Sequence, residues 1–200
     1  MTASMADLSK HLAAQLDWAQ IGLRLDEEGY VVLPGAWNHS PAESIAAALY
    51  EPLSRIANRW NEAMGVHDRY PSGFNKFLAQ NEEAGLSPPR SLLSRLQEQD
   101  YLPLHQHPQG GLIFPLQCVM VLSEPGKDFT GGEFVMTEQR PRMQSRPMVL
   151  PLQLGAVAVI AVGHRPVRGS RDYYRVNTKH AISRVHSGER IGLELLFNGP

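Results

Sequence analysis

Three histidines in the C-terminal half of this 200-residue chain have the types and spacing to bind a metal ion. His105 and His107 lie two residues apart in a β-prone segment, and side chains at i and i+2 of a strand point to the same face. Pro108 favours an extended backbone at His107. A third histidine, His180, lies in the β-prone segment 174–183. This pattern predicts a facial metal site. The alternative is an exposed or hydrogen-bonded histidine pair without metal.

Three other residues are candidates for the same pocket. Arg190 follows His180 by ten residues, after a turn, and comes near the pocket if the two strands form a hairpin. Tyr101 shares the strand parity of His105, so it either lines the pocket or packs in the core. Gln117 is a polar residue in an apolar run, and is either a pocket residue or a hydrogen-bonded core glutamine.

The first elements expected along the chain, before the segments that carry these residues, are mostly helices. Apolar residues recur at intervals of three and four from Met5 to Glu28, which predicts an amphipathic helix broken near Gly22. Ser40 is a suitable N-cap for a second helix, with proline at its first position. We therefore expect three further elements before residue 91: a strand at 30–33 and helices at 41–60 and 74–81.

After residue 91 the pattern changes to short apolar or alternating runs separated by glycine- and proline-containing turns. About eight strands at this spacing predict a sandwich, barrel or jelly roll. We expect one domain over 1–200, with a helical support at 1–90 and a β core at 91–200. The expected strands are 91–96, 102–106, 112–122, 133–137, 147–152, 156–162, 174–183 and 190–197.

The composition argues against some classes of binding partner. With 19 basic and 20 acidic residues the net charge is -1, which gives no electrostatic case for nucleic acid or a membrane surface. The arginines between 140 and 146 are interpreted as a solvated loop, or alternatively as a site that recruits an anionic substrate. Cys118, the single cysteine, is interpreted as a packed thiol rather than a nucleophile. Neither a signal peptide nor a membrane span is visible, so we expect a cytoplasmic protein.

Several stretches of the sequence resemble one enzyme family. They cover about half the chain, and the central one is quite specific. The chain resembles the bacterial 2-oxoglutarate/iron(II)-dependent oxygenases of the prolyl-4-hydroxylase-like superfamily, which implies a mainly β, double-stranded β-helix (jelly-roll) fold with N-terminal helices. The stretches are LHQ at 104–106, FPLQ at 114–117, LSEPGKDFTGGEFVMTEQRPRMQSR at 122–146, RPVRG at 165–169, YRVN at 174–177 and HAISRVHSGER at 180–190.

The resemblance also implies roles for residues. The family holds iron with a His-x-Asp pair and a distal histidine, and an arginine about ten residues further on pairs with the far carboxylate of 2-oxoglutarate. His105 then corresponds to the first ligand, His180 to the distal ligand and Arg190 to the carboxylate clamp. A guanidinium suits that role because it binds carboxylate through two parallel hydrogen bonds. Tyr101 is a further candidate for contacting the co-substrate.

Three positions depart from the family pattern. His107 stands where the family has aspartate, Gly192 where it has a hydroxyl that touches 2-oxoglutarate, and Leu96 where it has a tyrosine. With 2-oxoglutarate bound, exchanging the carboxylate for imidazole changes the formal charge of the iron site from about -1 to about 0. Imidazole still binds iron, copper, nickel and zinc, so His105, His107 and His180 are together predicted to hold Fe(II).

These observations predict a non-haem iron dioxygenase that uses O2 and 2-oxoglutarate to oxidise a C–H bond of a small molecule. Two alternatives stay open. The chain is either a three-histidine metal oxygenase that no longer uses 2-oxoglutarate, or a non-catalytic binding protein on the same fold.

Overall fold

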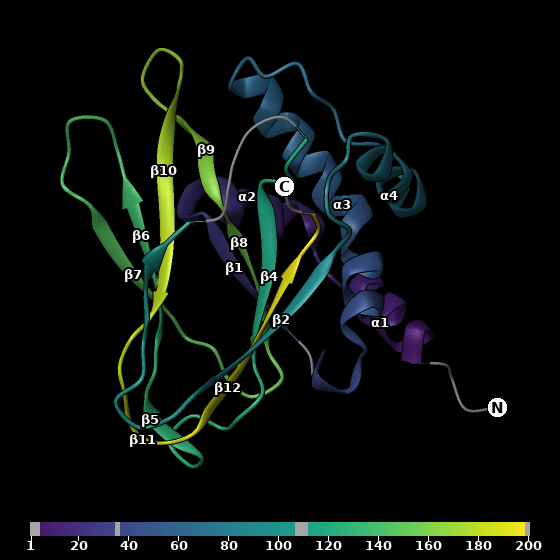
Figure 1. Ribbon diagram of the computed structural model, residues 1–200. Coiled ribbons are helices and arrows are strands. Elements are labelled where there is room, and N and C mark those ends of the chain that lie inside the picture. Colours follow the sequence, from purple (N-terminus) through teal and green to yellow (C-terminus); the bar gives the residue numbers. More distant parts are fainter. Residues whose placement is uncertain (1–4, 35–36, 107–111, 199–200) are drawn as a thin grey trace.

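Two facing antiparallel sheets form the body of the protein (Figure 1). The computed structural model describes residues 5–34, 37–106 and 112–198. The first sheet has the order β1 (Tyr30–Leu33), β8 (Val157–Ala161), β4 (Leu116–Val121), β12 (Arg190–Leu196) and β2 (Arg90–Leu96). The second has the order β3 (Leu102–His105), β10 (Tyr173–Ile182), β6 (Phe134–Gln139) and β7 (Arg146–Leu150), and β9 (Gly163–Arg168) also pairs with β10. A small third sheet joins β11 (Val185–Gly188) to β5 (Phe129–Gly131).

Strand β4 divides the core into two parts. All six of its residues are buried, and alternate side chains enter different apolar clusters. Val119 and Val121 face the second sheet, where they join Phe134 of β6 and Ile182 of β10. Cys118 faces the helices instead. The space between the sheets, called the barrel interior below, is therefore lined by one parity of each strand.

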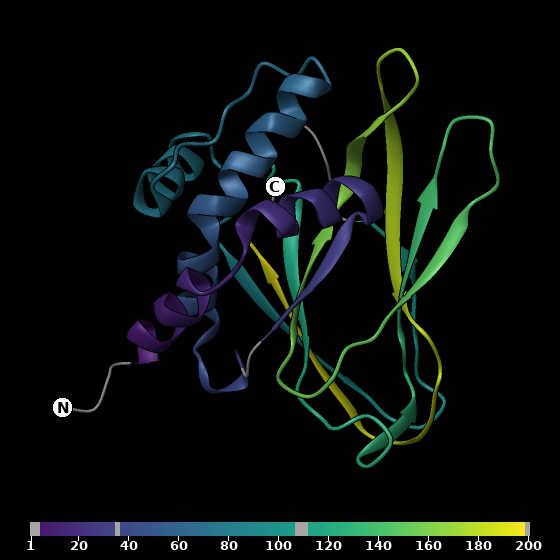
Figure 2. The same cartoon turned by 180° about the vertical axis from the view of Figure 1, so that it is seen from behind.

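The helices cover the outer face of the first sheet (Figure 2). They are α1 (Met5–Ala14), α2 (Trp18–Glu28), the 3-10 helix η1 (Trp37–His39), α3 (Ala42–Ala63) and α4 (Phe74–Glu83). The predicted break near Gly22 is wrong, because the chain breaks just before Asp17, whose side chain accepts a hydrogen bond from the Gln20 amide at 3.0 Å and caps α2. Gly22 stays helical and faces Arg59 of α3. Among the described helices, none is long and apolar enough to cross a membrane.

All eight strands predicted after residue 91 are present, and the jelly-roll architecture is confirmed. The sequence patterns missed β5, β9 and β11. Strand β9 contains proline and charged residues, which give a weak strand pattern. It forms because six of its residues pair with β10, from Gly163 opposite Thr178 to Arg168 opposite Tyr173.

The strands of His180 and Arg190 do not form a hairpin. Strand β10 belongs to the second sheet and β12 to the first, and β11 lies between them in the chain. Arg190 nevertheless reaches the same interior as His180, because the two strands lie in facing sheets.

A buried ion pair attaches α2 to the second sheet. Arg165 of β9 and Glu138 of β6 are both fully buried, and the Arg165 guanidinium donates to the Glu138 carboxylate. The same guanidinium donates to the carbonyls of Asp26 and Glu27, at 2.6 and 3.1 Å, at the C-terminal end of α2. Carbonyls at a helix C-terminus carry partial negative charge, so the cation is well placed there.

We predict that Glu138→Gln destabilises the protein by about 3–5 kcal/mol, because it leaves the buried Arg165 charge uncompensated. Urea denaturation followed by circular dichroism measures this free energy of unfolding. The matched control is Glu124→Gln, which removes an exposed pair with Lys127 and should cost less than about 1 kcal/mol. Equal effects of the two substitutions would contradict the structural role of the pair.

Candidate metal centre

The pairing of β10 with β3 brings two of the predicted histidines together. His180 lies directly opposite His105, and their ring centroids are 4.3 Å apart. His180 is 1% exposed and stacks on Phe134 at 5.6 Å, so its ring orientation is fixed by packing. His105 is half-buried, and its Nδ1 donates to the Pro103 carbonyl at 2.9 Å. In the neutral ring this leaves Nε2 of His105 as the metal-binding nitrogen.

The facing sheet adds two polar residues that face the histidines. Glu194 of β12 places Oε2 3.8 Å from His180 Nε2, and it offers a ligand atom that lies with those of His105 and His180 within 4.8 Å of one another. Gln117 of β4 is fully buried, and its amide Nε2 lies 3.4 Å from Glu194 Oε2 and 3.5 Å from His180 Nε2. Two imidazoles and a carboxylate form the donor set that suits non-haem iron(II).

Glu194 was not a sequence candidate. The sequence feature that indicates it is the even spacing of Arg190, Gly192 and Glu194. This spacing places a basic and an acidic residue on one face of a strand in which most side chains are apolar. Both charged residues are buried, and a buried charge is expected to have a partner or a function.

Arg190 lies further along the same face of β12. It is 2% exposed, and its Nε donates to the Gly132 carbonyl at 2.8 Å. Within the described part of the chain, its Nη1 is buried without a hydrogen-bond partner. Burial lowers the pKa of Arg190 to about 10, and the nearby Glu194 carboxylate opposes this shift, so the side chain is a cation at neutral pH. A buried cation with an unused donor can receive a carboxylate ligand.

Gly192 makes room for this guanidinium. A Cβ built on Gly192 would lie 2.4 Å from Arg190 Nη1 and 3.0 Å from the hydroxyl of Ser94, its partner on β2. The family pattern has a hydroxyl at the position of Gly192. The structure places a hydroxyl from the neighbouring strand beside that position instead. Leu96, the partner of Arg190 on β2, packs against the interior apolar cluster.

The remaining sequence candidates lie in different places. His107 falls outside the described residues, so its ligand role stays a prediction. Tyr101 is 59% exposed and is therefore not a core residue, and its contact with a co-substrate also stays a prediction. Gln117 is buried in the barrel interior beside the histidines. Burial raises the pKa of the Cys118 thiol to about 12, which agrees with a packed thiol rather than a nucleophile.

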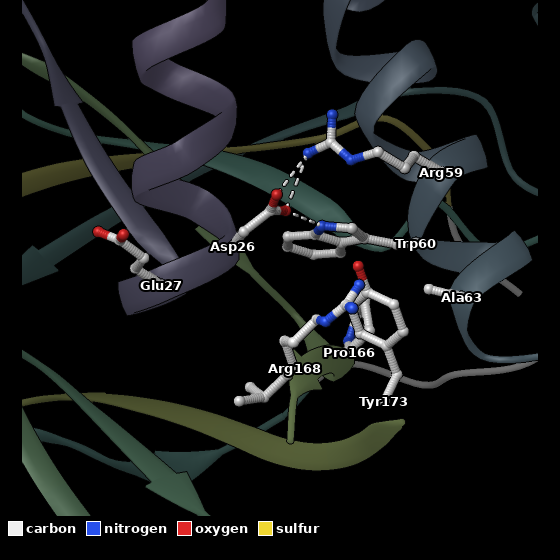
Figure 3. Close-up of a pocket in the computed structure, with 9 residues that line it drawn as sticks. Asp26, Glu27, Arg59, Trp60, Ala63, Pro166, Arg168 and Tyr173 are labelled. Atoms are coloured by element: carbon white, nitrogen blue, oxygen red, sulfur yellow. Dashed lines mark hydrogen bonds and ion pairs between the residues drawn. The ribbon is translucent and has the colours of Figure 1, made fainter. Parts of the chain in front are cut away.

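Two pockets lie near these elements. One of about 350 Å³ borders Arg190 and is lined by apolar and glycine residues that include Phe129, Gly132, Phe134 and Leu150. The other, of about 240 Å³, lies outside the barrel between α2, α3 and β9 (Figure 3). In Figure 3 the Asp26 carboxylate accepts hydrogen bonds from Arg59 and Trp60, so this acidic group of the pocket is already paired.

Comparisons with known proteins identify the family and the fold of this chain. Residues 38–199 match the model of a family described as "Oxygenase, catalysing oxidative methylation of damaged DNA". Two uncharacterized proteins of Mycobacterium tuberculosis, MT2286 and Rv2227, are each 38% identical over 156 residues, which is 78% of this chain and 67% of theirs. A prolyl 4-hydroxylase from Phytophthora capsici superposes with a TM-score of 0.50 at 16% identity, covering all of this chain and 67% of that one. This likeness supports the fold expected from the sequence.

If Arg190 binds 2-oxoglutarate, as the sequence predicts, Gly192→Ser should weaken that binding, although it adds the hydroxyl that the family pattern has there. The reason is that the new Cβ would collide with the Arg190 guanidinium, which Gly132 holds through its carbonyl. Isothermal titration calorimetry with 2-oxoglutarate under anaerobic conditions measures the affinity. Ser94→Ala removes the hydroxyl beside Gly192 without adding atoms, so comparing the two variants separates the loss of a hydroxyl from a collision with Arg190. Tighter binding by Gly192→Ser would contradict the prediction.

Proposed function

Because this chain belongs to the oxygenase family whose model it matches over residues 38–199, we propose that it is a non-haem iron(II) oxygenase with 2-oxoglutarate as co-substrate. The observation that carries this proposal is the pair His105 and His180, which face a buried carboxylate in an interior that also holds Arg190. Imidazole and carboxylate donors fit iron(II), and a buried guanidinium with an unused donor fits the carboxylate of 2-oxoglutarate.

In this proposal His105 and His180 hold the metal, and His107 is the third ligand expected from the sequence. The iron and 2-oxoglutarate, when bound, supply the activation of O2 that oxidises a substrate C–H bond. Arg190 binds and orients the far carboxylate of the co-substrate. The Pro103 carbonyl fixes which nitrogen of His105 carries the proton. Apolar side chains between the sheets, such as Met136 and Ile182, exclude water from this interior.

For the substrate, the sequence favours a small molecule, whereas the family description names damaged DNA. One observation supports nucleic acid as a second candidate. The hairpins β6–β7 and β9–β10 extend side by side from one end of the barrel (Figures 1 and 2). Although the whole chain is nearly neutral, these hairpins carry exposed arginines that suit phosphate contacts. They are Arg142, Arg146, Arg168, Arg171 and Arg175.

We predict that His180→Ala abolishes iron(II) binding, whereas Arg190→Met keeps iron(II) and loses 2-oxoglutarate. Anaerobic titration with iron(II) and then 2-oxoglutarate measures both steps, the second through the weak visible charge-transfer band of the complex. The melting temperature of each metal-free variant is recorded beside the titrations, because Arg190→Met also removes the hydrogen bond to the Gly132 carbonyl and the cation near Glu194.

The wild-type protein is the reference for this experiment. Metal binding by the wild type without the charge-transfer band would contradict the use of 2-oxoglutarate. Equal loss of metal in both variants would contradict the separate roles of His180 and Arg190.

The two substrate classes are distinguished by 2-oxoglutarate consumption in the presence of oligonucleotides. If nucleic acid is the substrate, a single-stranded DNA with methylated bases raises consumption several-fold, and an unmodified strand of the same sequence does not. Arg168→Glu combined with Arg171→Glu should then weaken the effect, as should added salt. No binding and no stimulation by either strand would leave the small-molecule substrate as the better candidate.

A further inference from the structure

We infer that Glu194 is a ligand of the metal and supplies the carboxylate that the sequence lacks at position 107. This inference rests on the proposed function, since it concerns the same centre. The sequence predicts a centre made only of histidines. The structure places a carboxylate among them from a different strand, in the facing sheet.

The first argument is geometric. Ligand nitrogens and oxygens about 2.1 Å from a common metal lie about 3–4 Å from one another. The ligand atoms of His105, His180 and Glu194 all lie within 4.8 Å of one another, and the Glu194–His180 separation is 3.8 Å. Small rotations of the side chains are therefore enough to bring the three to one ion. Because they come from β3, β10 and β12, a shared ion would also tie the two sheets together.

The second argument is the register of β12. Glu194 lies opposite Val119 of β4, one of the residues that face the barrel interior. Its side chain therefore points between the sheets, on the same face as Arg190. Gly192 lies between them and has no side chain, so the interior face of β12 carries an anion toward the histidines and a cation toward the pocket beside Arg190. Strand β12 thus carries both the inferred metal ligand, Glu194, and the side chain proposed to bind a carboxylate, Arg190.

The third argument is electrostatic. Glu194 is 8% exposed, and removing a carboxylate from water costs several kcal/mol unless it is paired. Gln117 donates to its Oε2 at 3.4 Å, which orients the carboxylate without neutralising it. The Glu194 carboxylate interacts with the Arg190 cation and lies 3.8 Å from His180 Nε2, and His180 is neutral once this nitrogen binds a metal. A divalent cation bound by His180 would then take the place of a proton opposite the carboxylate, and Glu194 would supply the negative charge that is absent at position 107.

The experiment measures metal affinity directly, without turnover. Fe(II) and Co(II) alone are titrated anaerobically into the wild type and into Glu194→Gln by isothermal titration calorimetry, and the Co(II) d–d absorption is recorded. We expect Glu194→Gln, which keeps the shape of the side chain, to lower the affinity at least 100-fold and to change the Co(II) spectrum. Removal of residues that only orient ligands typically costs 10- to 100-fold. Gln117→Met should therefore fall in this smaller range, with an unchanged spectrum type.

Two controls make the result specific. Glu189→Gln removes the same charge from a more exposed side chain just before β12 and should change the affinity less than two-fold. The melting temperature of each metal-free variant reports folding separately. Wild-type affinity in Glu194→Gln, together with loss of metal in His107→Ala, would overturn the inference and leave the proposed iron oxygenase intact. Loss of metal in Glu194→Gln, with no response of the wild type to 2-oxoglutarate, would instead support the inference and overturn the proposed co-substrate.

Discussion

The site depends on the register of strand β10. This strand pairs with β3, β6 and β9, so its position is fixed from both sides. A shift of one residue would turn His180 out of the barrel interior, because side chains on a strand alternate between faces. With the observed register, His180 lies between His105 on β3 and Met136 on β6, and its ring packs against Phe134.

Two buried arginines, Arg165 and Arg190, have different roles in the structure. The pair of Arg165 and Glu138 connects α2 to the second sheet, because the same guanidinium donates to two carbonyls of α2, so its role is structural. At Arg190 the Gly132 carbonyl accepts from Nε, and within the described residues Nη1 has no hydrogen-bond partner and is available to a ligand. An incompletely satisfied buried cation reduces stability in the absence of ligand. Such a cost is expected at a binding site.

The family has aspartate at the position of His107, and the structure changes what this difference implies for the metal site. Taken alone, it removes the anionic ligand and with it part of the support for oxidised iron. Glu194 offers a carboxylate to His105 and His180 from the opposite sheet, so the donor set of a non-haem iron centre is available without residue 107. In the same way, the hydroxyl of Ser94 stands beside the position where Gly192 lacks one. Side chains from other strands therefore lie close to the places that the family pattern assigns to positions 107 and 192.

Local periodicity in the sequence determined most of the N-terminal helices and the eight strands expected after residue 91, because both patterns are local properties of the chain. The resemblance to a known family implied the jelly roll and the grouping of His105 and His180 with Arg190. The sequence did not determine that β9 is a strand, that β10 and β12 lie in facing sheets, or that Glu194 and Gln117 meet the histidines. The tertiary structure decided these, because contacts between strands far apart in the chain depend on which edges pair and in what register. That Glu194 lies beside the two histidines becomes apparent only when its strand is placed opposite theirs.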